Sequence, residues 1–189
     1  MAKIKEEQAE LEGVLWVAKA MAVAARTAPK ARGVDAIETL IVSDKDLDAL
    51  ADAMEKHRAK TPRNAVFVRD ANNVRKSQAV LLVGLRDMRP KRAEDPLDCG
   101  ACGYGDCAGF LRVKRKEGSD FPGPVCLFQA IDLGIALASA CSVASRFHVD
   151  NRMMYTIGGP ANKLGWMESQ VIIGIPLSAS GKNIYFDRG

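Results

Sequence analysis

Residues 78–85 read QAVLLVGL, which after its first position is an unbroken run of apolar residues and glycine. A strand with one face in water alternates apolar and polar residues, whereas a strand that is covered on both faces need not. The run therefore predicts a strand in the interior of the molecule, with other elements packed on both of its faces.

Three other runs predict further strands on either side of this one along the chain. They lie at 36–43 (AIETLIVS), 64–69 (NAVFVR) and 171–176 (VIIGIP). Residues 70–76 (DANNVRK) are polar and predict a turn or a short helix between two of the strands. The sequence thus supplies enough strands for a sheet around residues 78–85.

Helices are indicated between the strands. Apolar residues recur at spacings of three and four over 5–26, which predicts an amphipathic helix. A second helix follows Ser43, and we expect His57 near its end to be exposed. Residues 126–147 predict a long helix rich in small side chains. The inner stripe of the second helix is predicted to be Leu47, Leu50, Ala51 and Met54. Because strands and helices alternate, we expect an α/β (α+β) layered domain with a central mixed sheet flanked by helices.

Composition limits the class of protein. Hydrophobic residues make up 48% of the 189 residues, so the chain can bury a core. The 27 basic and 23 acidic residues are scattered, and a formal charge of +4 does not indicate nucleic-acid binding. The N-terminal residues lack the apolar stretch of a signal peptide, and no run reaches the roughly 18 apolar residues of a membrane span. We therefore expect a cytoplasmic protein outside the membrane.

Five cysteines in a reducing compartment need a purpose other than disulfides. Four of them follow the pattern C-x2-C-x4-C-x18-C, and glycines between them permit tight turns. We call these four the loop cysteines: Cys99, Cys102, Cys107 and Cys126. Four clustered thiolates of this kind hold iron–sulfur clusters, so the pattern predicts one such centre.

Two other uses of the loop cysteines stay open at this stage. Structural zinc also takes four cysteines, although it more often uses two short knuckles, and free or redox-active thiols are a third use. Cys141 lies in an apolar helix and is expected to pack as a small hydrophobe. A basic run at 112–116 follows the third loop cysteine and reads either as a solvated surface or as a set of charges that offset a negative cluster.

The cysteine segment resembles a known motif. CGACGYGDCAGF at 99–110, with GPVC at 123–126, is similar to the 4Fe–4S motif of corrinoid iron–sulfur proteins and of Rnf-type electron-transport subunits. From about residue 8 to its end, the chain resembles a prokaryotic family of ferredoxin-domain-containing proteins. The segments that carry this resemblance are AARTAPKARGVD, RDANNVRKSQAV, DCGACGYGDC, DLGIALASA, VDNRMMYTIG and IGIPLSASGKNIYFDR. The resemblance implies a 4Fe–4S cluster on the loop cysteines.

A second resemblance concerns the fold. AARTAPKARG at 24–33 and TIGGPANKLG at 156–165 resemble two segments near the flavin of nitroreductase-like proteins. This implies a nitroreductase-like sandwich that binds FMN and forms a homodimer. The implied contacts of the flavin are Arg26, Lys30, Arg32, Gly158 and Gly159. The alternative is a basic loop that binds no ligand, because the N-terminal arginines typical of nitroreductases are missing.

These observations lead to one domain over 1–189, with a cluster-binding segment inserted at 95–130. We expect an iron–sulfur electron-transfer protein, in one form a small flavin-linked oxidoreductase that acts on a redox partner protein or a small molecule. The alternative is a non-catalytic ferredoxin-like accessory or a redox or iron sensor, in which the cluster orders a partner-binding loop. No residue pattern indicates a catalytic group.

Overall fold

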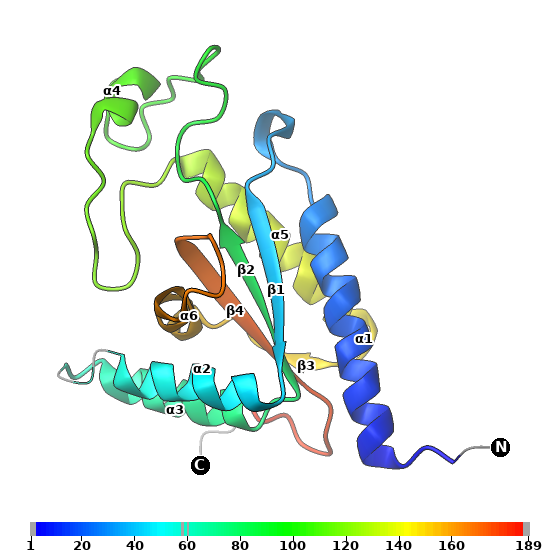
Figure 1. The fold of residues 1–189 in the computed structure, drawn as a ribbon. Coiled ribbons are helices and arrows are strands. Elements are labelled where there is room, and N and C mark those ends of the chain that lie inside the picture. The colour runs from blue at the N-terminus through cyan, green and yellow to red at the C-terminus, as the bar shows by residue number, and fades with distance from the viewer. Residues whose placement is uncertain (1–2, 58, 60, 187–189) are drawn as a thin grey trace.

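The computed structural model describes residues 3–57, 59 and 61–186, and its described elements form two helical layers around one sheet (Figure 1). The strands are β1 (Ile37–Ser43), β2 (Ala79–Leu85), β3 (Asp150–Asn151) and β4 (Val171–Ser178). They lie in the order β1-β2-β4-β3, and every pairing is antiparallel. The fold is therefore a layered α+β sandwich as expected, but the sheet is antiparallel where the sequence analysis expected a mixed one.

Strand β2 lies in the middle of the sheet and is buried along its whole length. Successive side chains of a strand point to opposite faces, so β2 contributes to both cores. Val80 and Leu82 join one apolar cluster. The remaining apolar side chains join the other: Ala79, Leu81, Val83 and Leu85. The prediction of a strand covered on both faces is confirmed.

One face of the sheet is covered by α1 (Glu6–Thr27) and α5 (Leu127–Arg146), which lie against each other (Figure 1). The opposite face is covered by α2 (Lys45–Lys56), α3 (Asn64–Arg75) and α6 (Gly158–Leu164). The predicted inner stripe of α2 is confirmed, because all four of its residues are buried.

The predicted strand at 64–69 is wrong, because these residues form the first half of α3. A short apolar run fits a strand or a helix equally well. Here the spacing of buried residues over the whole segment 64–75 is that of a helix. Phe67, Ala71 and Val74 recur at helical intervals and are buried, and α3 packs along α2. Residues 70–76 were predicted to be a turn or a short helix, and the helix is correct: they continue α3 to its end at Arg75.

Of the described helices, only α5 has the length and apolar composition of a membrane span. Its position is that of a core helix, since it packs on α1 and on the sheet. Its buried residues include the polar Gln129 and the charged Asp132. The amide of Gln129 donates to the carbonyl of Arg89 at 3.1 Å.

The chain between β2 and α5 extends beyond one end of the sheet and carries one short helix, α4 (Cys107–Arg112) (Figure 1). Residues 113–126 lead from α4 back to α5, and we call them the return arm. Within the return arm, Lys116 and Gly123 exchange two backbone hydrogen bonds of 2.8 and 2.9 Å. This segment, residues 86–126, contains all four loop cysteines, and we call it the insertion.

A buried ion pair fixes the start of the insertion to the body of the fold. The ammonium of Lys91 donates to the carboxylate of Asp132 on α5 and to the carbonyl of Val34, and both charged side chains are 2% exposed. Asp132 also accepts a 3.0 Å hydrogen bond from the backbone of Ala31, in the 3-10 helix η1 (Ala31–Gly33). One carboxylate therefore joins the insertion, α5 and the loop after α1.

We predict that Lys91→Met and Asp132→Leu each lower the free energy of unfolding by about 3–5 kcal/mol, because either change leaves one buried charge without its partner. The double variant should be closer to the wild-type stability than either single variant, since it buries no charge. Chemical denaturation measures all three. The control is Arg89→Met, whose exposed pair with Asp87 should contribute less than about 1 kcal/mol. Additive losses in the double variant would contradict the prediction.

Candidate functional site

The backbone of the insertion is shaped around the loop cysteines. Gly100 and Gly103 adopt positive φ angles of 70° and 86°, which a side chain would disfavour. The carboxylate of Asp98 accepts a 2.7 Å hydrogen bond from the amide of Cys107. At the other end, the amide of Cys126 donates to the carbonyl of Met88 at 2.8 Å. Cys107 begins α4 and Cys126 directly precedes α5, so both thiols lie at the ends of helices.

Three of the loop cysteines line one small pocket. Cys99, Cys107 and Cys126 surround it together with apolar side chains, and Lys91 closes one side. Cys107 and Cys126 are buried, while Cys99 is exposed. Burial raises the pKa of the Cys107 thiol above its ordinary value, and this effect outweighs the lowering effect of its backbone hydrogen bond. Cys102 is half-buried in the same loop and does not line the pocket.

The donor set fits an iron–sulfur cluster in kind, but the present pocket does not fit it in size. The cavity between the three cysteines is about 10 Å³, which is the space of one water molecule. Within the part of the chain that the structure describes, no three His, Cys, Asp or Glu side chains meet in a metal-binding arrangement. A cluster on all four loop cysteines would therefore need a wider pocket that Cys102 also lines.

Cys141 lies apart from this pocket. It is on α5, half-buried, and packs against the core between α1, α5 and the sheet. Burial raises the pKa of its thiol to about 11. A thiol in this state is a poor nucleophile and a poor metal ligand. The geometry agrees with the expected packing role.

The basic residues of the predicted flavin loop already have partners. Arg26 pairs with Asp35 at 2.8 Å and donates to the carbonyl of Ile37. Lys30 donates to two backbone carbonyls at the end of α1. Arg32, at a positive φ of 56°, pairs with the carboxylate of Asp95 in the insertion. A phosphate in this loop would have to exchange with these partners.

The two predicted glycines lie on the other face of the sheet, so the structure does not bring them to the basic loop. α6 packs in the cluster that contains α2 and α3, whereas the end of α1 packs in the opposite cluster. A Cβ on Gly158 would lie 1.8 Å from the carbonyl oxygen of Ile172 in β4. A Cβ on Gly159 would lie 3.1 Å from the ring of His57. Close packing inside one chain accounts for both glycines.

His57 is buried, contrary to the expectation that it would be exposed, and it anchors the insertion. Its Nε2 lies 2.8 Å from a carboxylate oxygen of Asp120, and the hydroxyl of Tyr155 donates to the same carboxylate. The adjacent ring of Phe121 packs on Tyr155 with centroids 5.8 Å apart. This contact set has no signal in the sequence, because its members come from three distant segments. It holds the far end of the insertion against α2.

Comparison with protein families and known sequences gives two matches. Residues 122–188 match a family described as an uncharacterized protein containing a ferredoxin domain. An uncharacterized protein of Archaeoglobus fulgidus is 44% identical over 185 residues, which cover 98% of this chain and 97% of the archaeal one. The second match extends over the insertion and the sandwich alike.

Solved structures with a similar fold include nitroreductases and FMN-containing oxidoreductases. A nitroreductase with bound FMN from Desulfitobacterium hafniense aligns with a TM-score of 0.52 at 14% identity, over 96% of this chain and 81% of that one. An NADPH:FMN oxidoreductase from Vibrio harveyi gives 0.52 at 12% identity, over 96% of this chain. This chain spans only 63% of the Vibrio enzyme. The nitroreductase-like fold expected from the sequence is confirmed.

Proposed function

Since this chain belongs to the family of proteins that contain a ferredoxin domain, we propose that it transfers electrons through one 4Fe–4S cluster held by its four loop cysteines. The observation that carries the proposal is the shared pocket of Cys99, Cys107 and Cys126. Cys99 and Cys107 lie in the first half and the middle of the insertion and Cys126 at its end, so the fold brings residues that are separate in the sequence to one pocket.

A bound cluster would supply one-electron chemistry. The chain contributes the surroundings. Cys107 and Cys126 are buried, which limits access of water and oxygen, while Cys99 on the exposed side faces the surface. Lys91 lines the pocket, and because its charge is balanced by Asp132 the pair contributes polarity and position rather than net positive charge. Through these contacts the insertion would shield a bound cluster from solvent on its buried side.

The predicted change on cluster binding is local. Because the pocket is small and Cys102 does not line it, the four loop cysteines would hold a cluster only after a rearrangement within the segment between the anchors. The anchors at Lys91 and at Asp120 lie on either side of this segment and keep the rest of the insertion in place. This arrangement also suits a sensor, in which gain or loss of the cluster changes the surface of one loop. We keep that non-catalytic role as the second candidate.

We predict that protein purified without oxygen holds about four iron and four sulfide per chain and absorbs broadly in the visible range. Cys107→Ala should lose most of the iron, because it removes a thiolate from the buried side of the pocket. Cys141→Ala is the matched control and should keep the full iron content, since its thiol packs in the core. Iron and sulfide analysis measures both variants. One equivalent of zinc in colourless protein would contradict the cluster.

We also propose that the protein binds FMN near the loop at 26–32, as a small flavin-linked reductase. The support is the nitroreductase-like fold and the group of cationic side chains in that loop. Gly158 and Gly159 of the same chain are too distant in the fold to share this site, because the sheet lies between. A flavin that touches both sets would have to lie between two copies of the chain.

We predict that Arg26→Ala and Arg32→Ala each reduce the flavin retained after purification by about tenfold or more, since each removes a charge-assisted bond to an anion. Arg146→Ala, which removes an exposed arginine at the end of α5, is the control and should retain flavin as the wild type does. Flavin released by denaturation is measured by fluorescence. Equal retention in all three variants would argue against this loop.

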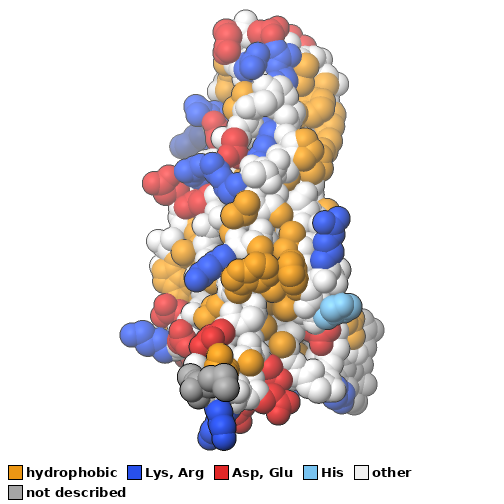
Figure 2. Space-filling model, turned by 90° about the vertical axis from the view of Figure 1, so that its right-hand side faces the viewer, with side chains coloured by type: hydrophobic (Ala, Val, Ile, Leu, Met, Phe, Trp, Pro, Cys, Tyr) orange, Lys and Arg blue, Asp and Glu red, His pale blue; other side chains and the backbone are white. Residues whose placement is uncertain are grey.

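We further propose that the chain forms a homodimer and works in the cytoplasm, where its five free thiols stay reduced. Apolar side chains gather on the face that carries α1 (Figure 2). Trp16 on α1 is 55% exposed and contacts Phe147, which is 49% exposed, at a ring distance of 4.9 Å. Ile131 and Ile135 on α5 are also exposed. A second copy is the partner that the nitroreductase-like fold favours for this face.

We predict that Trp16→Glu converts the dimer into a monomer, because it places a charge in the middle of an apolar contact. Sedimentation velocity at micromolar concentration measures the change in mass. The control is Val66→Glu on α3, a similar charge on an exposed apolar residue of the opposite layer, which should leave the dimer intact. A wild-type protein that sediments as a monomer would exclude this interface.

A further inference from the structure

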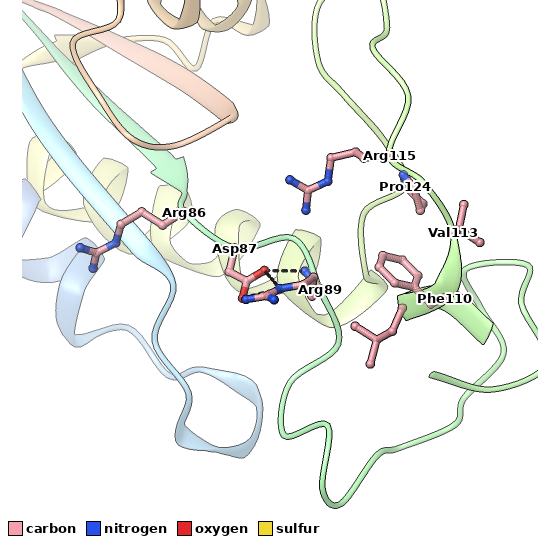
Figure 3. Close-up of a pocket in the computed structure, with 8 residues that line it drawn as sticks. Arg86, Asp87, Arg89, Phe110, Val113, Arg115 and Pro124 are labelled. Carbon is pink, nitrogen blue, oxygen red and sulfur yellow. Dashed lines mark hydrogen bonds and ion pairs between the residues drawn. The ribbon is translucent and has the colours of Figure 1, made fainter. Parts of the chain in front are cut away.

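A wide cleft lies between the end of β2 and the insertion, next to the loop cysteines (Figure 3). Its volume of about 510 Å³ falls in the range of sites for small organic molecules. One wall follows β2 directly, and the opposite wall is formed by α4 and the return arm. Phe110 and Pro124 belong to that wall, and each lies within three residues of a loop cysteine.

The cleft has an apolar side and a charged side. Phe110, Leu111 and Val113 supply the apolar side, and Leu111 is 43% exposed. On the charged side, the guanidinium of Arg89 binds the carboxylate of Asp87 through two parallel hydrogen bonds of 2.9 and 2.8 Å (Figure 3). This pair is close to neutral, so it contributes orientation and polarity rather than net charge.

Arg115 supplies the unbalanced positive charge. Its side chain points from the return arm into the space between Asp87 and Pro124 (Figure 3). One of its terminal nitrogens donates to the side-chain amide of Gln170, which directly precedes β4. Within the described residues it forms no ion pair, so its guanidinium has no matching carboxylate. Arg86 also lines the cleft but extends away from it, toward the carbonyl of Ile37.

Asp87 lines the same cleft as Arg115. Burial raises the pKa of Asp87, but the hydrogen bonds and charge of Arg89 outweigh it, with the smallest contribution from the charge of Arg115, so the pKa lies below its usual value. The direction of this shift agrees with the position of Arg115 across the cleft from Asp87 (Figure 3). The amide of Gln170 holds Arg115 in position before any ligand arrives.

We propose that this cleft binds a small organic anion, with its carboxylate or phosphate on Arg115 and its apolar part against Leu111 and Val113. A guanidinium that is fixed at one nitrogen and open at the others matches such a group bidentately. The basic run at 112–116 accordingly divides into a ligand-binding arginine and neighbours that face the solvent. This site depends on the shape of the insertion and not on the identity of the group held by the loop cysteines.

The test is to titrate small-molecule probes into the anaerobically purified full chain and to monitor binding by nuclear magnetic resonance. The probes are phenyl phosphate, benzoate and neutral benzyl alcohol, so that phosphate and carboxylate are compared directly and charge is separated from the ring. We expect at least one of the two anions to shift amide signals on both walls of the cleft and to bind about tenfold more tightly than the alcohol. Leu111→Ser should weaken phenyl phosphate but not inorganic phosphate.

Arg115→Gln should weaken the preferred anion by about tenfold, because it removes one charge-assisted contact. Arg112→Gln is the matched control: it removes the same charge at the end of α4, outside the cleft, and should change binding less than about twofold. Equal losses in both variants, or no binding by either anion, would overturn the proposal. Circular dichroism excludes loss of fold as the cause. Iron analysis of the same samples shows whether they hold a cluster, so the result for anion binding is judged separately from the proposal of a cluster.

Discussion

The buried ion pair between Lys91 and Asp132 is the contact on which the arrangement of the other parts depends. Lys91 lies near the start of the insertion, Asp132 lies in α5, and the same carboxylate accepts a hydrogen bond from the backbone of Ala31 after α1. Three segments that are far apart in the chain therefore meet at one buried carboxylate. A buried pair of this kind adds little net stability compared with an apolar contact, but it permits only one alignment of its parts. Alignment is what a pocket lined from both ends of the insertion requires.

The second anchor of the insertion complements the first. His57, Asp120 and Tyr155 tie its far end to the opposite helical layer, so the insertion spans the end of the sheet from one layer to the other. Between the two anchors, the loop cysteines lie on backbone that has glycine turns and little regular structure. The two anchors therefore fix both sides of the segment that carries the cysteines, whose own backbone has few regular hydrogen bonds to hold it.

Residue spacing along the chain predicted secondary structure and burial well, but it did not predict contacts between segments that are distant in the sequence. The apolar run of β2 and the inner stripe of α2 were identified because the spacing of their apolar residues indicates which positions are buried. The segment 64–69 was misassigned because its short run suits two periods, and only packing on α2 selects the helix. Strand direction depends on how connections cross the sheet, so the antiparallel order was not foreseen. The cysteine spacing indicated a shared centre, whereas Lys91 and His57 gave no signal because their partners are remote in sequence.

The position of Cys126 immediately before α5 has an electrostatic consequence of its own. The amides of a first helical turn lack partners within the helix and carry a partial positive charge, and no side chain accepts from them at this end of α5. A sulfur atom that gains negative charge there is stabilised by the backbone, whatever the neighbouring side chains are. The helix that passes through the core of the sandwich would thereby stabilise negative charge on the cluster proposed for its tip, through backbone amides rather than through a side chain.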